Sequence, residues 1–132
     1  MIQISQFGEI TQFKMGRESL GQAPWEPPGQ VLYWTAAYLV DGLLIDTGCP
    51  HTAEEFVRSL EGRVVKLAVN THYHEDHVGA NCLLQQKFGI RILASRESIP
   101  LINGVYKLYP YQELVWGYPV PTKVEPLPDK IE

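Results

Sequence analysis

The stretch Thr71-His72-Tyr73-His74-Glu75-Asp76-His77-Val78-Gly79 decides how this sequence folds and what it can bind. It holds three of the chain's four histidines, with an aspartate directly before the last of them. An apolar run precedes the stretch and a helical apolar pattern follows it, which is the strand-end position where α/β folds place their sites. Four potential ligands so close together predict a metal site rather than a polar loop that contains histidines by coincidence.

The residue types in this stretch suit a borderline metal such as zinc, which takes imidazole nitrogen and carboxylate oxygen. Side chains alternate along an extended segment, so we expect the rings of His72 and His74 to point to the same side and Glu75 to point away into solvent. Asp76 and His77 lie where the chain turns into the following helix and can face a neighbouring point. The loop can therefore offer two ligands to each of two adjacent metals.

The sequence on either side predicts an alternation of strands and helices. Strands are expected at 2–7, 10–15, 31–40, 43–46, 64–69 and 90–94, and helices after Thr52, over 80–88 and over 95–99. Asp41-Gly42 is a two-residue hairpin signal, and Thr52 with Glu55 matches a capping box. Gly62 and Gly89 are placed to end helices. The β-α-β-α-β order in the middle predicts an α/β chain.

Two motifs together resemble those of the metallo-β-lactamase superfamily. His72-x-His74-x-Asp76-His77 is similar to the family's metal-binding signature, and Leu43-Leu44-Ile45-Asp46-Thr47-Gly48 is similar to its upstream aspartate motif. The resemblance covers residues 2 to 94. It implies the N-terminal half of an αββα sandwich, with a mixed β-sheet and flanking helices.

The resemblance also implies roles for single residues. His72 and His74 would bind one metal, Asp76 and His77 would help to bind a second, and Asp46 would support the loop by hydrogen bonding. Asp76 is in addition our candidate catalytic residue. The implied cofactor is zinc, with iron or manganese as alternatives, and a metal lowers the pKa of bound water to about 7. The implied reaction is hydrolysis of an ester, thioester, lactone or similar bond in a small molecule.

The sequence departs from the family downstream of the motif. No histidine follows His77, and the only later aspartate is Asp129. Each metal would then have two ligands, short of the three that catalytic zinc usually takes. We expect a single partial domain over 1–132, with a regular core over 1–104 and an aromatic, proline-rich tail over 105–132 that is poor in helix and sheet. A truncated piece of a longer hydrolase, inactive alone, is favoured over a naturally short chain or two copies that complete each other.

Further expectations concern partners and surroundings. A half-sandwich would expose the inner face of its sheet, and large apolar surfaces associate, so we expect a homodimer or higher oligomer. Trp25 and the aromatic segment 106–118 could line a substrate entrance, form a dimer contact or simply cover the core. We expect Cys49 to be buried, Cys82 to pack beside its helix and His51 to lie at the surface.

Charge and composition exclude some classes of function. The formal net charge of −4 argues against a nucleic-acid binder, which would need a basic face. No apolar run reaches the roughly 20 residues that span a bilayer, and residues 1–7 do not resemble a secretory signal. We therefore expect a cytoplasmic protein.

Two readings from other classes stay open beside the hydrolase: an iron-binding oxidoreductase of the same fold, and a non-catalytic metal-binding or oligomerisation module. Asp76 followed by His77 resembles the broad hydrolase branches of the family and points away from antibiotic hydrolysis. The sequence leaves the substrate unidentified.

Overall fold

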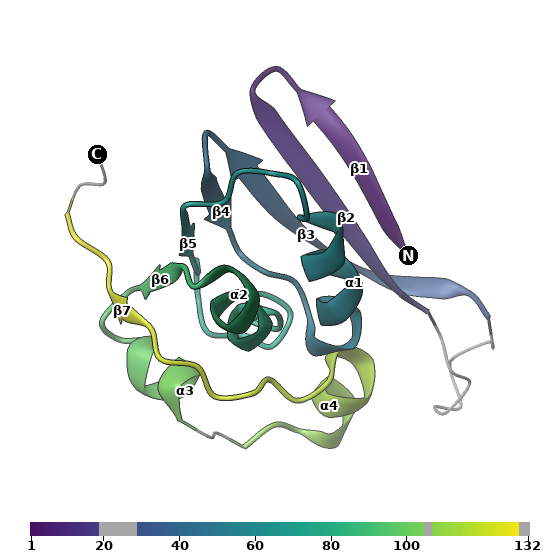
Figure 1. Cartoon of the computed structure of the whole chain (residues 1–132). Coiled ribbons are helices and arrows are strands. Elements are labelled where there is room, and N and C mark those ends of the chain that lie inside the picture. The colour runs from purple at the N-terminus through teal and green to yellow at the C-terminus, as the bar shows by residue number, and fades with distance from the viewer. Residues whose placement is uncertain (19–28, 105–106, 130–132) are drawn as a thin grey trace.

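A mixed β-sheet runs through the computed structural model, which describes residues 1–18, 29–104 and 107–129 (Figure 1). Among these residues the sheet has seven strands that neighbour one another in chain order. Neighbours from the first strand to the fourth pair antiparallel, and neighbours from the fourth strand to the seventh pair parallel. The strands are β1 Ile2–Phe7, β2 Ile10–Glu18, β3 Val31–Val40, β4 Leu43–Ile45, β5 Leu67–Val69, β6 Arg91–Ala94 and β7 Glu125–Pro126.

The helices lie on one face of this sheet, and Figure 1 shows α1 and α2 side by side there. Parallel strands that follow one another in the same direction along a sheet are joined by right-handed crossovers, so their helices fall on the same face. The helical elements are η1 Pro50–Thr52, α1 Ala53–Ser59, α2 Asn81–Phe88, α3 Ile99–Asn103 and α4 Pro110–Trp116. The predicted α/β class, a mixed sheet with flanking helices, is thus confirmed.

The hydrophobic core fills the space between this face and the helices. Leu39, Leu44, Ala68 and Ile92 are in register across four strands and all point into it. Phe13 of β2 meets Phe56 of α1 edge-on, with ring centroids 5.4 Å apart. On α1, the apolar residues Ala53, Phe56 and Val57 are buried against this core.

The opposite face of the sheet carries no helix within the described ranges. Along each strand, the side chains of this face alternate with those that point into the core. They include Trp34, Tyr38, Ile45 and Val69, and we call this side of the sheet the outer face. Trp34 and Tyr38 are each 37% exposed, and Ile45 and Val69 are half-buried. The outer face is therefore a partly exposed apolar surface. It corresponds to the sheet face that a half-sandwich was expected to leave uncovered.

Some local predictions are confirmed and others are wrong. Asp41 and Gly42 both have positive φ, as a type I′ hairpin requires, and Gly89 ends α2 in the left-handed conformation. Thr52 forms no capping box, because it closes the 3₁₀ turn of η1 and its hydroxyl bonds to Cys49 instead.

Several element boundaries differ from those predicted, some by a single residue. The second strand extends to Glu18, and the expected strand over 64–69 is shortened to β5, with Val64 65% exposed. The third helix begins at Ile99, the last residue of the range expected to open it.

The tail, expected to be poor in helix and sheet, contains the short helix α4 and the two-residue strand β7 among its described residues. Helix α4 begins with Pro110 at its first turn, where a missing N–H costs nothing, and β7 pairs in parallel with β6. Tyr109 and Tyr111 are exposed and their rings stack at 6.0 Å. Trp25 and Tyr106 lie outside the described residues. No described helix combines the length and the apolar character needed to cross a membrane.

Candidate metal centre

The loop that carries the histidines lies beyond the carboxyl ends of β4 and β5. Asp46 follows β4 directly, and residues 70–80 connect β5 to α2. Two backbone hydrogen bonds join these segments, from Thr47 N to His77 O at 2.9 Å and from Gly79 N to Gly48 O at 2.7 Å. The loop is therefore fixed to the end of the neighbouring strand.

His72, Asp76 and His77 form a group that could hold a metal ion. Each offers one ligand atom, and these atoms lie within 4.8 Å of one another. The imidazole rings of His72 and His77 have centroids 4.0 Å apart, and all three residues are half-buried. Two imidazoles and one carboxylate are a donor set that zinc and other borderline divalent metals accept.

Asp46 supports this group from below and is almost fully buried. Its Oδ1 accepts a hydrogen bond from Thr71 N at 2.8 Å, and its Oδ2 accepts one from the Thr71 hydroxyl at 2.7 Å. The same Oδ2 lies 2.9 Å from Nδ1 of His77. This contact leaves Nε2 of His77 facing Asp76 Oδ2 at 3.3 Å, the arrangement in which a carboxylate orients a metal-binding imidazole.

The charges of the group shift its protonation. Burial lowers the pKa of His77, but hydrogen bonds to Asp46 and Asp76 and their negative charges outweigh burial and raise the pKa to about 9. Burial raises the pKa of Asp76, yet its bond to His77 and the charge of His77 bring it below its usual value. Burial, followed by the charges of His77 and His74, lowers the pKa of His72.

Glu75 does not follow the expected alternation. The His74 ring lies 4.7 Å from that of His72, on the same side as expected, but it is exposed and stands outside the group of three. Glu75, expected in solvent, is only 3% exposed. The physical reason is a turn, because His77 N bonds to His74 O and the chain is not extended there. The division of the four residues between two metals stays a prediction.

Residues that sequence reasoning missed also fix the loop. The buried hydroxyl of Thr35, on β3, donates to Asp76 O at 2.7 Å. Thr47, Asn70 and Asn81 are buried behind the loop, and no role in the site was predicted for any of them. Their positions, at strand ends and at a helix start beside the metal-binding motif, were the signal in the sequence that could have predicted a supporting role.

The cysteines stand apart from the ligand group. Cys49 is buried, as expected, and burial raises the pKa of its thiol, which disfavours the thiolate that metals bind. Cys82 is half-exposed on α2.

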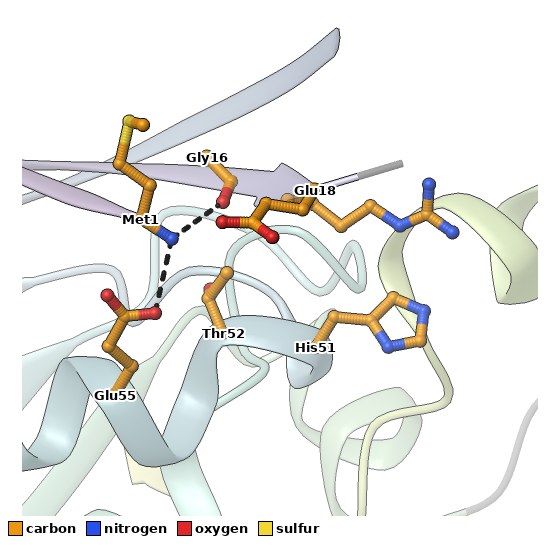
Figure 2. A pocket seen from close by; sticks show the side chains of 7 residues that line it. Met1, Gly16, Glu18, His51, Thr52 and Glu55 are labelled. Carbon is orange, nitrogen blue, oxygen red and sulfur yellow. Dashed lines mark hydrogen bonds and ion pairs between the residues drawn. The ribbon is translucent and has the colours of Figure 1, made fainter. Parts of the chain in front are cut away.

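A separate pocket of about 290 Å³ opens between β2 and α1 (Figure 2). It is lined by Met1, Gly16, Arg17, Glu18, His51, Thr52 and Glu55. The Met1 amine donates to Gly16 O at 3.1 Å and to Glu55 Oε2 at 3.2 Å. The pocket contains no residue of the histidine loop and mixes both charges, so it is distinct from the metal centre.

Solved structures share this fold. A flavoprotein from Thermotoga maritima is 22% identical, with a TM-score of 0.65 over 93% of this chain and 32% of its own. A subclass B3 metallo-beta-lactamase from a soil metagenome library is 23% identical, with a TM-score of 0.60 over 93% of this chain and 44% of its own. One from Bradyrhizobium japonicum is 24% identical, with a TM-score of 0.58 over 73% and 39%. The chain thus spans less than half the length of each.

A family model is the more specific comparison, since these structural likenesses show the fold alone. The model of the metallo-beta-lactamase superfamily matches residues 35–132, which include the whole histidine loop and Asp46. With the motifs, the sheet and the ligand group in agreement, this chain belongs to the metallo-beta-lactamase superfamily.

Proposed function

We propose that this chain provides the metal-binding half of a zinc-dependent hydrolase that acts on an ester, thioester, lactone or similar bond of a small molecule. The observation that carries the proposal is the approach of the ligand atoms of His72, Asp76 and His77 to within 4.8 Å of one another. The buried carboxylate of Asp46 on Nδ1 of His77 adds the support that metal-binding imidazoles usually have.

The residues divide the work between them. When bound, a zinc ion supplies the Lewis acidity that brings the pKa of water toward neutrality. Asp46 keeps His77 in one orientation, so that Nε2 faces the centre. Asp76 has a lowered pKa and a side chain that is 27% exposed, so its carboxylate stays ionised and can orient a water molecule. His74, at the rim, is the remaining candidate ligand.

A complete site needs more ligands than this chain offers. Catalytic zinc usually takes three protein ligands. Two metals would have to divide the four candidate ligands of the loop between them, and no histidine follows His77. We therefore propose that turnover requires ligands from beyond these 132 residues, and that the chain alone binds metal without hydrolysing substrate.

Metal content by elemental analysis, with the intact mass checked on the same sample, tests the proposal. We expect about one zinc or more per chain, lost in His77→Ala. His51→Ala is the matched control, because His51 is the one histidine outside the loop, and it should keep the metal. His74→Ala then decides whether His74 is a ligand. A metal-free parent chain with the correct mass would overturn the proposal for this chain.

An iron-containing oxidoreductase is the second candidate. A protein named as a flavoprotein shares this fold over 93% of this chain, so the fold is compatible with redox work. Expression in medium that contains equal iron and zinc separates the two, since selective uptake of iron supports redox work and selective uptake of zinc supports hydrolysis. A non-catalytic metal-binding module is the third reading, and measurable esterase or lactonase turnover would eliminate it.

A further inference from the structure

Three buried polar side chains lie directly behind the histidine loop. Thr47 follows β4, Asn70 follows β5 and Asn81 begins α2. Their exposed fractions are 0%, 2% and 1%. We call these three residues the amide clamp, because two of them are joined through their amides.

Asn70 and Asn81 bond to each other reciprocally. Asn81 Nδ2 donates to Asn70 Oδ1 at 2.7 Å, and Asn70 Nδ2 donates to Asn81 Oδ1 at 3.1 Å. The Thr47 hydroxyl donates to the same Oδ1 of Asn81 at 3.0 Å. The clamp therefore joins the ends of two neighbouring strands to the start of the helix that follows the loop.

The clamp also contacts the loop itself, and its contacts converge on the backbone around His77. The Thr47 hydroxyl accepts a hydrogen bond from Ala80 N at 3.2 Å and lies 3.3 Å from His77 O. Asn70 Nδ2 lies 3.5 Å from the same carbonyl oxygen. Asp46 fixes the His77 ring from one side, while the clamp fixes its backbone from another.

A buried polar group is costly unless it is hydrogen-bonded, so three of them in one place need a compensating arrangement. Here each partner satisfies the others, and the removal of one leaves buried donors or acceptors unpaired. A network of this kind permits one arrangement of its members and resists others. Such rigidity is what a metal centre needs from the residues around its ligands.

We propose that Thr47, Asn70 and Asn81 are positioning residues of the metal centre, which hold the His77 backbone where its imidazole can meet His72 and Asp76. The inference rests on the proposed metal-binding function and adds the residues that set its affinity. They are not among the candidate ligands and contact the loop backbone, so their effect passes through the loop.

Thr47→Val is the sharpest variant, because it keeps the shape of the side chain and removes the hydroxyl. Thr47→Ser restores the hydroxyl and is the conservative rescue. Thr122→Val is the matched control, since Thr122 is a buried threonine whose hydroxyl bonds to a backbone carbonyl, that of Val120. Asn70→Ser, which removes the amide pair, is the second variant if Thr47→Val does not fold.

Amide hydrogen exchange of the metal-free chain is the first measurement. The loss of the hydroxyl should speed exchange about two- to tenfold within 71–81, which corresponds to the net contribution of one hydrogen bond. Thr47→Ser and Thr122→Val should leave exchange in 71–81 at the parent rate. Unchanged exchange in Thr47→Val, or in Asn70→Ser as its replacement, overturns the inference.

Cobalt titration, followed by the visible absorption of the bound ion, is the second measurement. Thr47→Val should weaken cobalt binding about tenfold or more and change the absorption band, as other supporting residues of metal sites do, and Thr47→Ser should restore both. Faster exchange with unchanged cobalt affinity would overturn the positioning role. If the parent chain binds no cobalt, the proposed function fails, and the exchange result alone decides whether the clamp restrains the loop.

Discussion

Asp46 combines an unusual backbone with an exacting set of contacts. Its φ is +61°, a conformation that aspartate and asparagine adopt more readily than other non-glycine residues. In this conformation its carboxylate accepts hydrogen bonds from the Thr71 amide and hydroxyl and also contacts Nδ1 of His77. The residue thus serves both the turn of the chain and the orientation of His77.

Asp46→Asn should separate these two roles. Asparagine tolerates the same backbone, so the chain should stay folded, but it cannot hold the charge opposite His77. We expect zinc or cobalt affinity to fall about 10- to 100-fold, measured by competition titration. Asp41→Asn is the matched control, because Asp41 also has positive φ but is exposed in the hairpin. Equal affinities of the two variants would contradict the role of Asp46.

The pKa of His77 makes the stability of the metal-free chain depend on pH. Its folded pKa of about 9 exceeds the usual 6.5, so its contribution is fully present below pH 6.5 and is lost as pH rises through about 9. The lowered pKa of Asp76 acts in the other direction, and its contribution is present above pH 3.8 and lost at more acidic pH. Urea unfolding from pH 6.5 to pH 9 should show stability falling with pH.

His77→Gln provides the control for this pH dependence. It removes the titrating group, so the loss of stability between pH 6.5 and pH 9 should flatten. A parent chain whose stability does not change across this window would show that Asp46 and Asp76 do not hold the His77 proton as described.

The sequence predicted which candidate ligands come together better than it predicted their surroundings. His72, Asp76 and His77 are close in the chain, so a short loop brings them together almost whatever its exact conformation. Glu75 was misplaced because one turn bond, from His77 N to His74 O, abolishes the two-residue alternation. Thr35 was missed because its contact with Asp76 joins residues far apart in the chain.

At the scale of elements, the loop and the segment after β4 approach more closely than side chains allow. A Cβ atom placed on Gly79 would lie 2.1 Å from the backbone carbon of Cys49. The glycine is required here for space, and its N–H bonds to Gly48 O in the same contact.

Gly79→Ala should therefore damage both stability and metal binding. We expect the free energy of unfolding to fall by about 1–3 kcal/mol, the usual cost of overpacking, together with weaker cobalt binding. Gly89→Ala is the matched control: Gly89 has positive φ but open space around its Cβ position, so it should lose stability and keep cobalt affinity. Parallel losses of affinity in both variants would argue against a local effect on the loop.

The elements of the tail show why its proline content predicted less helix and sheet than the tail contains. Prolines disfavour the interiors of helices and strands, but Pro110 occupies a first helical turn and Pro126 lies in an edge strand. The sequence alone could not reveal these positions, because β7 depends on β6, which lies about 30 residues earlier in the chain. The middle of the fold, with its regular apolar periods, was predicted with only shifted boundaries.

At the scale of the molecule, the outer face is an apolar surface that the described helices leave partly exposed to solvent. Trp34 and Tyr38 are each more than a third exposed on the sheet face that the described helices leave bare. The chain also spans less than half the length of the structures it matches. We propose that, in isolation, two copies associate through this face.

Light scattering across a range of concentrations checks the association. The parent chain should be a dimer or larger, and Tyr38→Glu should shift it toward monomer, because a charge in a buried apolar interface is costly. Tyr111→Glu is the matched control, since Tyr111 is an exposed tyrosine on α4 rather than on the sheet. A clean monomer for the parent chain would refute the proposal.

The two edges of the sheet differ in what they offer to another strand. Leu127 N donates to Ala94 O, so the amide nitrogens of residues 126 and 128 face outward, and both residues are prolines without an N–H. The opposite edge, β1, carries no such block along Ile2–Phe7. Growth of the sheet from molecule to molecule needs two receptive edges. Contact between two β1 strands would close on itself as a pair, so the prolines of the tail protect the chain against fibre formation.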